Sequence, residues 1–171
     1  MKIQAIFETI PKTIRKNIYL RISNINLPEA YISMDKKILT ISIFYEKMDE
    51  DVILFTIYHE LSHLSDIYFY RIPFYIPFSK KYRCYSYMDE IHADFYAAKE
   101  LQLTKERAIH IIKIKQQYAR TQNSTISHPS WEQRILFLQK GECDQTIVNP
   151  VKEMIGYKGE IQYFYADIYL A

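Results

Sequence analysis

The stretch from Asp49 to Asp66, DEDVILFTIYHELSHLSD, decides how the rest of the chain is interpreted. Its acidic residues at 49–51 stand where a helix N-terminus favours capping side chains and negative charge. Apolar side chains then recur at helical spacing at positions 54, 57, 61 and 64. We therefore predict a helix over 52–66, with one buried face and the opposite face turned toward a cleft.

Within this helix lies an H-E-x-x-H motif formed by His59, Glu60 and His63. Residues four apart on a helix differ by about 40° around the axis and about 6 Å along it, so two imidazoles can converge on one ion. Glu60 lies about 100° round from His59, beside that ion, where it can take a proton from a zinc-bound water and pass it to the leaving amine. We predict His59 and His63 as zinc ligands and Glu60 as a catalytic residue.

A catalytic zinc needs a third protein ligand, and the segment 89–101, a predicted helix, offers one in Glu90. Asp94 lies on the same face and is expected to accept the N–H of a ligand histidine. His92 is the rival ligand. Because His92 lies about 200° round the helix from Glu90, both cannot face the ion, and Glu90 is preferred.

A third motif begins at His128, which precedes Pro129 at the entrance of a predicted helix over 129–140. A histidine fixed at such a turn can donate a hydrogen bond to a developing oxyanion, so we predict His128 as a second catalytic residue. Arg134 is expected to anchor this segment on a carboxylate. The alternative for His128 is an ordinary surface turn.

Outside these motifs the patterns alternate between helix and strand, which predicts an α+β fold. We expect a single domain over 1–143 and a C-terminal tail over 144–171. The remaining predicted elements are helices over 10–22 and 104–119, strands over 30–33 and 37–45, a long packed loop over 67–88, and a strand-like stretch over 160–170.

Composition excludes several classes of protein. The chain has 171 residues, and its 22 basic and 20 acidic residues are mixed along it, so no nucleic-acid partner is expected. Its 3 glycines, at 141, 156 and 159, cannot form a P-loop or a dinucleotide-binding fingerprint. Cys84 and Cys143 form no C-x-x-C pair and are expected to be reduced thiols.

The N-terminus has charges scattered through it and does not resemble a signal peptide. There is also no run of about 18 apolar residues that would predict a transmembrane helix. We therefore expect a soluble cytoplasmic protein. The aromatic stretch 72–78, flanked by Arg71, Lys80 and Lys81, suits a cleft wall better than a membrane-surface anchor.

The three motifs, in this order, resemble those of the gluzincin metallopeptidases of the HtpX, Oma and CAAX prenyl endopeptidase family. The resemblance implies a zincin-like fold, in which a small mixed sheet packs against an active-site helix, a glutamate helix and backing helices. It also implies an endopeptidase that acts on a peptide or protein substrate, with one zinc ion on His59, His63 and Glu90 and with Glu60 as general base. The matching residues are His59, Glu60 and His63 (H-E-x-x-H), Glu90, Ala93 and Asp94 (E-x-x-A-D), and His128, Pro129, Ser130 and Arg134 (H-P-S…R).

Many relatives carry membrane helices that are missing here, so the closer similarity is to the small soluble minigluzincins. That group is associated with segments that block their own clefts, which makes the stretch 156–170 a candidate inhibitory strand of a zymogen. Two alternatives stay open. One is a regulatory peptidase that cleaves a repressor or antitoxin, similar to the ImmA type; the other is a zinc-binding interaction module without turnover.

Overall fold

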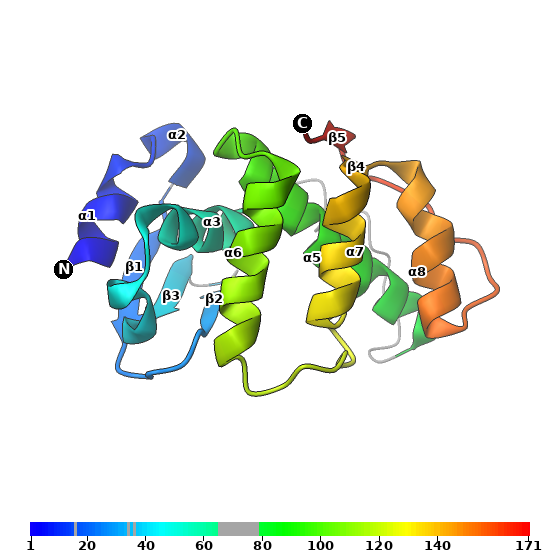
Figure 1. Cartoon of the computed structure of the whole chain (residues 1–171), viewed down its shortest axis with the longest axis horizontal. Coiled ribbons are helices and arrows are strands. Elements are labelled where there is room, and N and C mark those ends of the chain that lie inside the picture. The colour runs from blue at the N-terminus through cyan, green and yellow to red at the C-terminus, as the bar shows by residue number, and fades with distance from the viewer. Residues whose placement is uncertain (16, 34, 36, 65–78) are drawn as a thin grey trace.

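A mixed three-stranded sheet, a two-stranded ribbon and a set of helices make up the α+β fold in this computed structural model, which describes residues 1–15, 17–33, 35, 37–64 and 79–171 (Figure 1). The elements are α1 (Lys2–Thr9), α2 (Lys12–Arg15), β1 (Tyr19–Ser23), β2 (Ala30–Ser33), β3 (Ile38–Ser42), η1 (Ile43–Lys47), α3 (Glu50–Ser62), α5 (Lys80–Glu100), α6 (Lys105–Tyr118), α7 (Trp131–Lys140), β4 (Glu142–Cys143), η2 (Gln145–Ile147), α8 (Val148–Ile155) and β5 (Ile168–Tyr169).

The three-stranded sheet has the order β1-β3-β2, with β1 parallel and β2 antiparallel to β3. Its central strand is buried, and Leu39 and Ile41 are fully inaccessible. The predicted strands over 30–33 and 37–45 are both present, although the second ends at Ser42 and continues as η1. The β2 strand lies at an edge of this sheet, with one side of its backbone facing away from β3.

The predicted helix over 10–22 is wrong. Ile10 is extended, with φ −68° and ψ 131°, as expected for a residue before proline, and Pro11 separates α1 from the single turn of α2. The chain then enters β1, where Leu20 pairs with Leu39 of β3. The helix had been expected because isoleucine recurs every four residues, at positions 10, 14 and 18. This spacing is coincidental, because parallel pairing with β3 overrides it.

The α3 helix begins at Glu50, close to the prediction, but it is buried on nearly every side. Solvent is excluded from Val52, Ile53 and Phe55 as fully as from Ile57, which belongs to the predicted buried face. The reason is that α3 contacts the sheet and α1 as well as α5. The prediction of a single buried face was therefore too narrow. Residues 65 and 66, the predicted end of this helix, lie outside the described part of the chain.

The α5 helix begins at Lys80, nine residues before the predicted start, and Ser79 caps it by accepting a hydrogen bond from the backbone N–H of Tyr82 at 3.1 Å. The predicted loop is therefore wrong for 80–88, while 67–78 lies outside the described residues. Aromatic and sulfur side chains such as Tyr85 and Met88 are buried in the core from this helix. Proline acts only on its neighbours, so Pro77 does not prevent a helix that starts three residues later.

The predicted helices over 104–119 and 129–140 are confirmed as α6 and α7. Thr104 caps α6, and Ser130 with Gln133 forms a capping box on α7. Gly141 then ends α7 in the left-handed region, with φ 74°. The predicted ranges of these two helices are correct because the residues that start and stop them act locally.

The C-terminal residues contribute to the same core as the rest of the chain. Ile147, Val151 and Tyr165 are buried members of it, and α8 packs on α5. The α8 helix was missed, and the predicted strand over 160–170 reduces to β5, which pairs with β4. Figure 1 shows the sheet with α1 and α3 toward one end of the long axis and α8 at the other.

Cys84 and Cys143 are both buried free thiols, as expected. No helix among the described residues is long and apolar enough to cross a membrane.

Candidate metal centre

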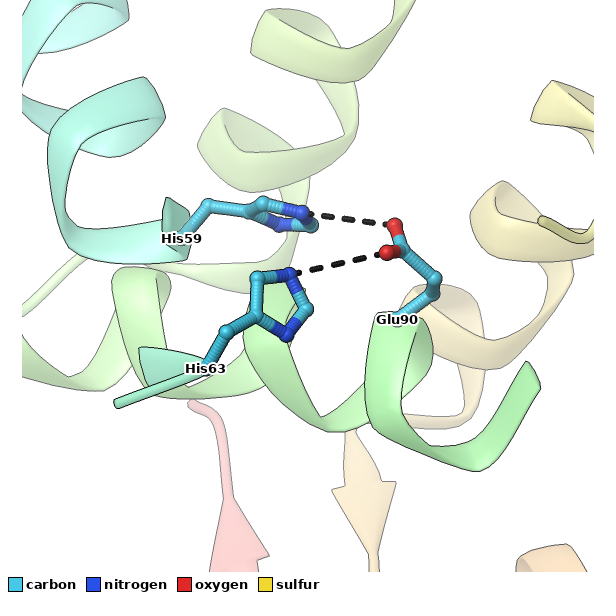
Figure 2. A group of neighbouring side chains, drawn as sticks. All are labelled: His59, His63 and Glu90. Atoms are coloured by element: carbon cyan, nitrogen blue, oxygen red, sulfur yellow. Dashed lines mark ion pairs between the residues drawn. The ribbon is translucent and has the colours of Figure 1, made fainter. Parts of the chain in front are cut away.

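His59 and His63 project from the C-terminal end of α3 toward Glu90 of α5, as Figure 2 shows. The Nε2 atom of His59 lies 3.3 Å from Oε2 of Glu90, and that of His63 lies 3.5 Å from Oε1. The two imidazoles meet edge to face, with centroids 5.2 Å apart. The packing of α3 on α5 therefore brings together the three ligands that the motifs predicted.

The spacing of this donor set is compatible with one bound metal ion. With metal–ligand bonds of about 2.0–2.1 Å, neighbouring ligand atoms of a tetrahedron are separated by roughly 3.3 Å. The two nitrogen–oxygen separations are 3.3 and 3.5 Å, and one ligand atom from each residue lies within 4.8 Å of the others. His59, His63 and Glu90 can therefore hold a metal ion without moving far.

The other nitrogen of each ring is held by a carboxylate. His59 Nδ1 lies 2.9 Å from Asp94 Oδ1, and His63 Nδ1 lies 2.8 Å from Asp89 Oδ2. When Nδ1 carries the ring proton, it donates a hydrogen bond to the carboxylate. Nε2 then keeps the lone pair that binds a metal ion. Asp94 thus has the predicted partner.

Asp89 was missed by the sequence reasoning. The only available signal was an acid directly before Glu90 in the Asp89–Glu90 pair, and nothing local indicated which histidine it would meet. Its carboxylate reaches His63 only because α3 and α5 cross at this point.

Arg134 anchors α7 on the metal centre through Asp94, as predicted. Its Nε and Nη2 atoms lie 2.7 and 2.6 Å from the two carboxylate oxygens of Asp94, and both residues are buried. Burial works to raise the pKa of Asp94, but the Arg134 guanidinium and His59 outweigh it and lower that pKa to about 2. Asp94 is therefore a permanent anion that fixes both His59 and α7.

His128 also reaches the centre, with Nε2 3.3 Å from Oε1 of Glu90 and about half of its side chain exposed. Its Nδ1 lies 2.7 Å from the hydroxyl of Ser127, and the Ser127 carbonyl accepts a hydrogen bond of 2.7 Å from Ser86 on α5. The turn before Pro129 is thus tied to the helix that carries Glu90. His128 therefore lies beside Glu90, and its hydrogen bond to a developing oxyanion stays a prediction.

Glu60 is buried and borders the same cleft as the two histidines, but it is outside the group that can bind the metal. The rival ligand, His92, points elsewhere: its ring packs against Tyr165 at 4.9 Å. The helical angles used in the sequence analysis therefore placed both residues correctly.

A cleft of about 850 Å³ opens beside the metal centre. One part of its wall is the segment 28–32, which includes most of the edge strand β2, and another comes from the loop between α6 and α7. All the residues that line the cleft come before Ile135 in the chain. The C-terminal tail, residues 144–171, therefore does not line it. The aromatic stretch 72–78, predicted as a cleft wall, lies outside the described residues.

Acidic neighbours change the protonation of His59 and His63. Burial alone would lower the pKa of His63, but Asp89, Glu90 and Glu60 outweigh burial and raise it to about 10. The pKa of His59 is also raised, because the effects of Asp94 and Glu90 exceed that of burial. The imidazole of His63 therefore carries a second proton at neutral pH in the metal-free protein, and the pKa of His59 is shifted in the same direction.

A zinc ion bound by these residues would displace the second proton of His63, so we expect zinc binding at pH 7 to release protons. Since the folded pKa of His63 lies above its unfolded value of about 6.5, its contribution to metal-free stability is complete below that pH and is lost as the pH rises toward 10. Zinc affinity and the zinc-induced rise in Tm should therefore increase between pH 6 and 8. Calorimetry in buffers of different ionisation enthalpy counts the protons, and a pH-independent Tm shift would contradict the prediction.

Asp89→Asn should weaken zinc binding about 10- to 100-fold, because Asn cannot hold the His63 ring as an anion does. The effect on stability should be small, since 29% of the Asp89 side chain is exposed. Competition with a chromophoric chelator measures the affinity, and Asp167→Asn, an exposed change in the tail, is the matched control. Equal affinity in both variants would show that Asp89 does not support the ligand.

Comparison of the chain with family profiles, curated proteins and solved structures found no match.

Proposed function

We propose that the chain is a zinc-dependent endopeptidase with a zincin-like fold, similar to the minigluzincins. One observation carries the proposal: His59, His63 and Glu90 each offer a ligand atom within 4.8 Å of the others, while Glu60 borders the cleft beside them. Nitrogen and carboxylate donors suit zinc, and a set of three protein ligands leaves a fourth position open, which is the pattern of catalytic rather than structural zinc sites.

Zinc bound there would supply Lewis acidity, polarising a carbonyl group and lowering the pKa of a water molecule. Glu60 is the group that accepts the proton of the attacking water and returns it to the amine that leaves. His128, on its tethered turn, donates a hydrogen bond to the oxygen that develops negative charge. Asp94 and Asp89 keep the ligand histidines in the required tautomer.

The substrate is an extended peptide. The β2 strand borders the cleft and is an edge strand, so its outward N–H and C=O groups are available to pair with a further strand. Main-chain pairing depends little on side chains, so it suits an endopeptidase that accepts varied sequences.

The arrangement of elements supports the zincin-like part of the proposal. The mixed sheet packs on the helix that carries His59 and His63, and α5 supplies Glu90 from the neighbouring layer. The α7 helix backs both through the Arg134–Asp94 contact. This arrangement is the one that the resemblance leads us to expect, and it supports the proposal.

The test combines metal analysis with turnover. Protein purified without added metal is analysed for bound metal by mass spectrometry and then incubated with a quenched fluorescent peptide library, before and after removal and return of zinc. We expect one zinc per chain, and cleavage that disappears with chelation and returns with zinc. Zinc binding without cleavage would favour the interaction module, and absence of zinc binding would overturn the proposal.

A further inference from the structure

Lys115 occupies an unusual position on α6. The helix packs into the core through Ala108, Ile111 and Ile112, and Lys115 continues this spacing of three and four residues. Only 6% of Lys115 is exposed, yet it lines the cleft that contains the metal centre. A lysine therefore stands where the helical pattern calls for an apolar residue, and it borders the cleft.

Two of the carboxylates near Lys115, those of Asp94 and Glu90, are already engaged. Asp94 accepts both hydrogen bonds from Arg134 and a third from His59, and Glu90 faces the two ligand histidines. Among the residues that the structure describes, no carboxylate lies within ion-pair distance of Lys115. Arg134, which is also buried and lines the cleft, is paired with Asp94, whereas Lys115 has no ion-pair partner in the described part of the chain.

The surroundings leave Lys115 positively charged at neutral pH. Burial and the nearby Arg134 lower its pKa to about 8, against the opposite effects of Asp94, Glu60 and Glu90. Tyr45, which also lines the cleft, stays neutral because burial raises its pKa. A buried cation without a fixed partner is costly, and an anion that enters the cleft would compensate it.

We propose that Lys115 binds a carboxylate of the ligand, so that the cleft selects peptides with an acidic side chain or a free C-terminal carboxylate near the metal-binding groups. This inference rests on the proposed peptidase function and defines its substrate class. A carboxylate fits because a charge-assisted hydrogen bond from a lysine is strengthened in a cleft that is partly shielded from water.

Binding can be measured without turnover. Zinc-loaded protein carrying Glu60→Gln is titrated with fluorescent peptides in matched pairs, and affinity is followed by anisotropy. One series replaces each residue in turn by Asp or by Asn; the other compares a free C-terminus with an amidated one. We expect one acidic position or the free terminus to bind about tenfold tighter than its neutral counterpart. The position identifies which carboxylate is recognised.

Lys115→Met should abolish that preference, and Lys115→Arg should keep part of it. Lys113→Met is the matched control, because Lys113 is on the exposed side of the same helix and should leave the preference unchanged. Far-ultraviolet circular dichroism and zinc content show whether each variant is folded. If Lys115→Met does not fold, the Asp/Asn and carboxylate/amide comparisons made with protein that retains Lys115 still test the inference. Equal binding of every pair, or the same preference in Lys115→Met, would overturn this inference alone. Binding of no peptide by zinc-loaded protein would overturn the proposed function as well.

Discussion

Glu60→Gln should reduce peptide cleavage about 10²- to 10⁴-fold while zinc content and Tm stay close to those of the wild type. Gln has the size and shape of Glu but cannot accept the proton of the attacking water. Because Glu60 is outside the group of metal ligands, the substitution leaves the metal-binding atoms in place. Initial rates with the best peptide of the library, together with metal analysis, measure the effect.

Glu132→Gln is the control, since it makes the same chemical change at an exposed position of α7. It should retain wild-type turnover. Substantial cleavage by zinc-loaded Glu60→Gln protein would show that another group transfers the proton, and a large loss of zinc would show that Glu60 supports the metal rather than the chemistry.

Asp94→Asn should destabilise the protein by about 3–5 kcal/mol, since it leaves the buried Arg134 guanidinium without its anion. For a domain of this size that corresponds to a fall in Tm of roughly 10 °C. Zinc affinity should also fall about 10- to 100-fold, because His59 loses the carboxylate that orients it. Thermal unfolding with and without zinc separates the two effects.

The double substitution Asp94→Asn and Arg134→Met provides the control. By removing both charges it should recover most of the lost stability, but not the zinc affinity, which depends on His59. If the single and double variants unfold at the same temperature, the Arg134–Asp94 pair is not what connects α7 to the centre. If zinc affinity recovers with stability, Asp94 has no separate effect on His59.

Most of the proposed centre was predictable because its parts are short and helical. The spacing of His59 and His63 fixes their relative direction as soon as α3 is recognised, and the same reasoning puts Glu90 and Asp94 on one face of α5 and His92 on another. The capping signals at Ser130 and Gly141 likewise determined α7 locally.

The errors occurred where a distant partner decides the local structure. The isoleucines before position 22 fit a helix by spacing, but β3 recruits residues 19–23 as a parallel strand. The aromatic residues after Ser79 had favoured a loop over 67–88. Burial in the core instead stabilises residues 80–88 as the beginning of α5. Asp89 and Lys115 gain their significance in the same way, from elements remote in the sequence.

The sequence alone determined the α+β class, the helical position of the H-E-x-x-H residues and the identity of the three candidate ligands, because helical geometry acts within one or two turns. The tertiary structure decided how those ligands meet, which carboxylate holds each histidine, and which cation is left in the cleft. These depend on the crossing of α3, α5, α6 and α7, where residues tens of positions apart come within hydrogen-bond distance. Such contacts are set by the packing of whole helices around one core, and no local spacing encodes them.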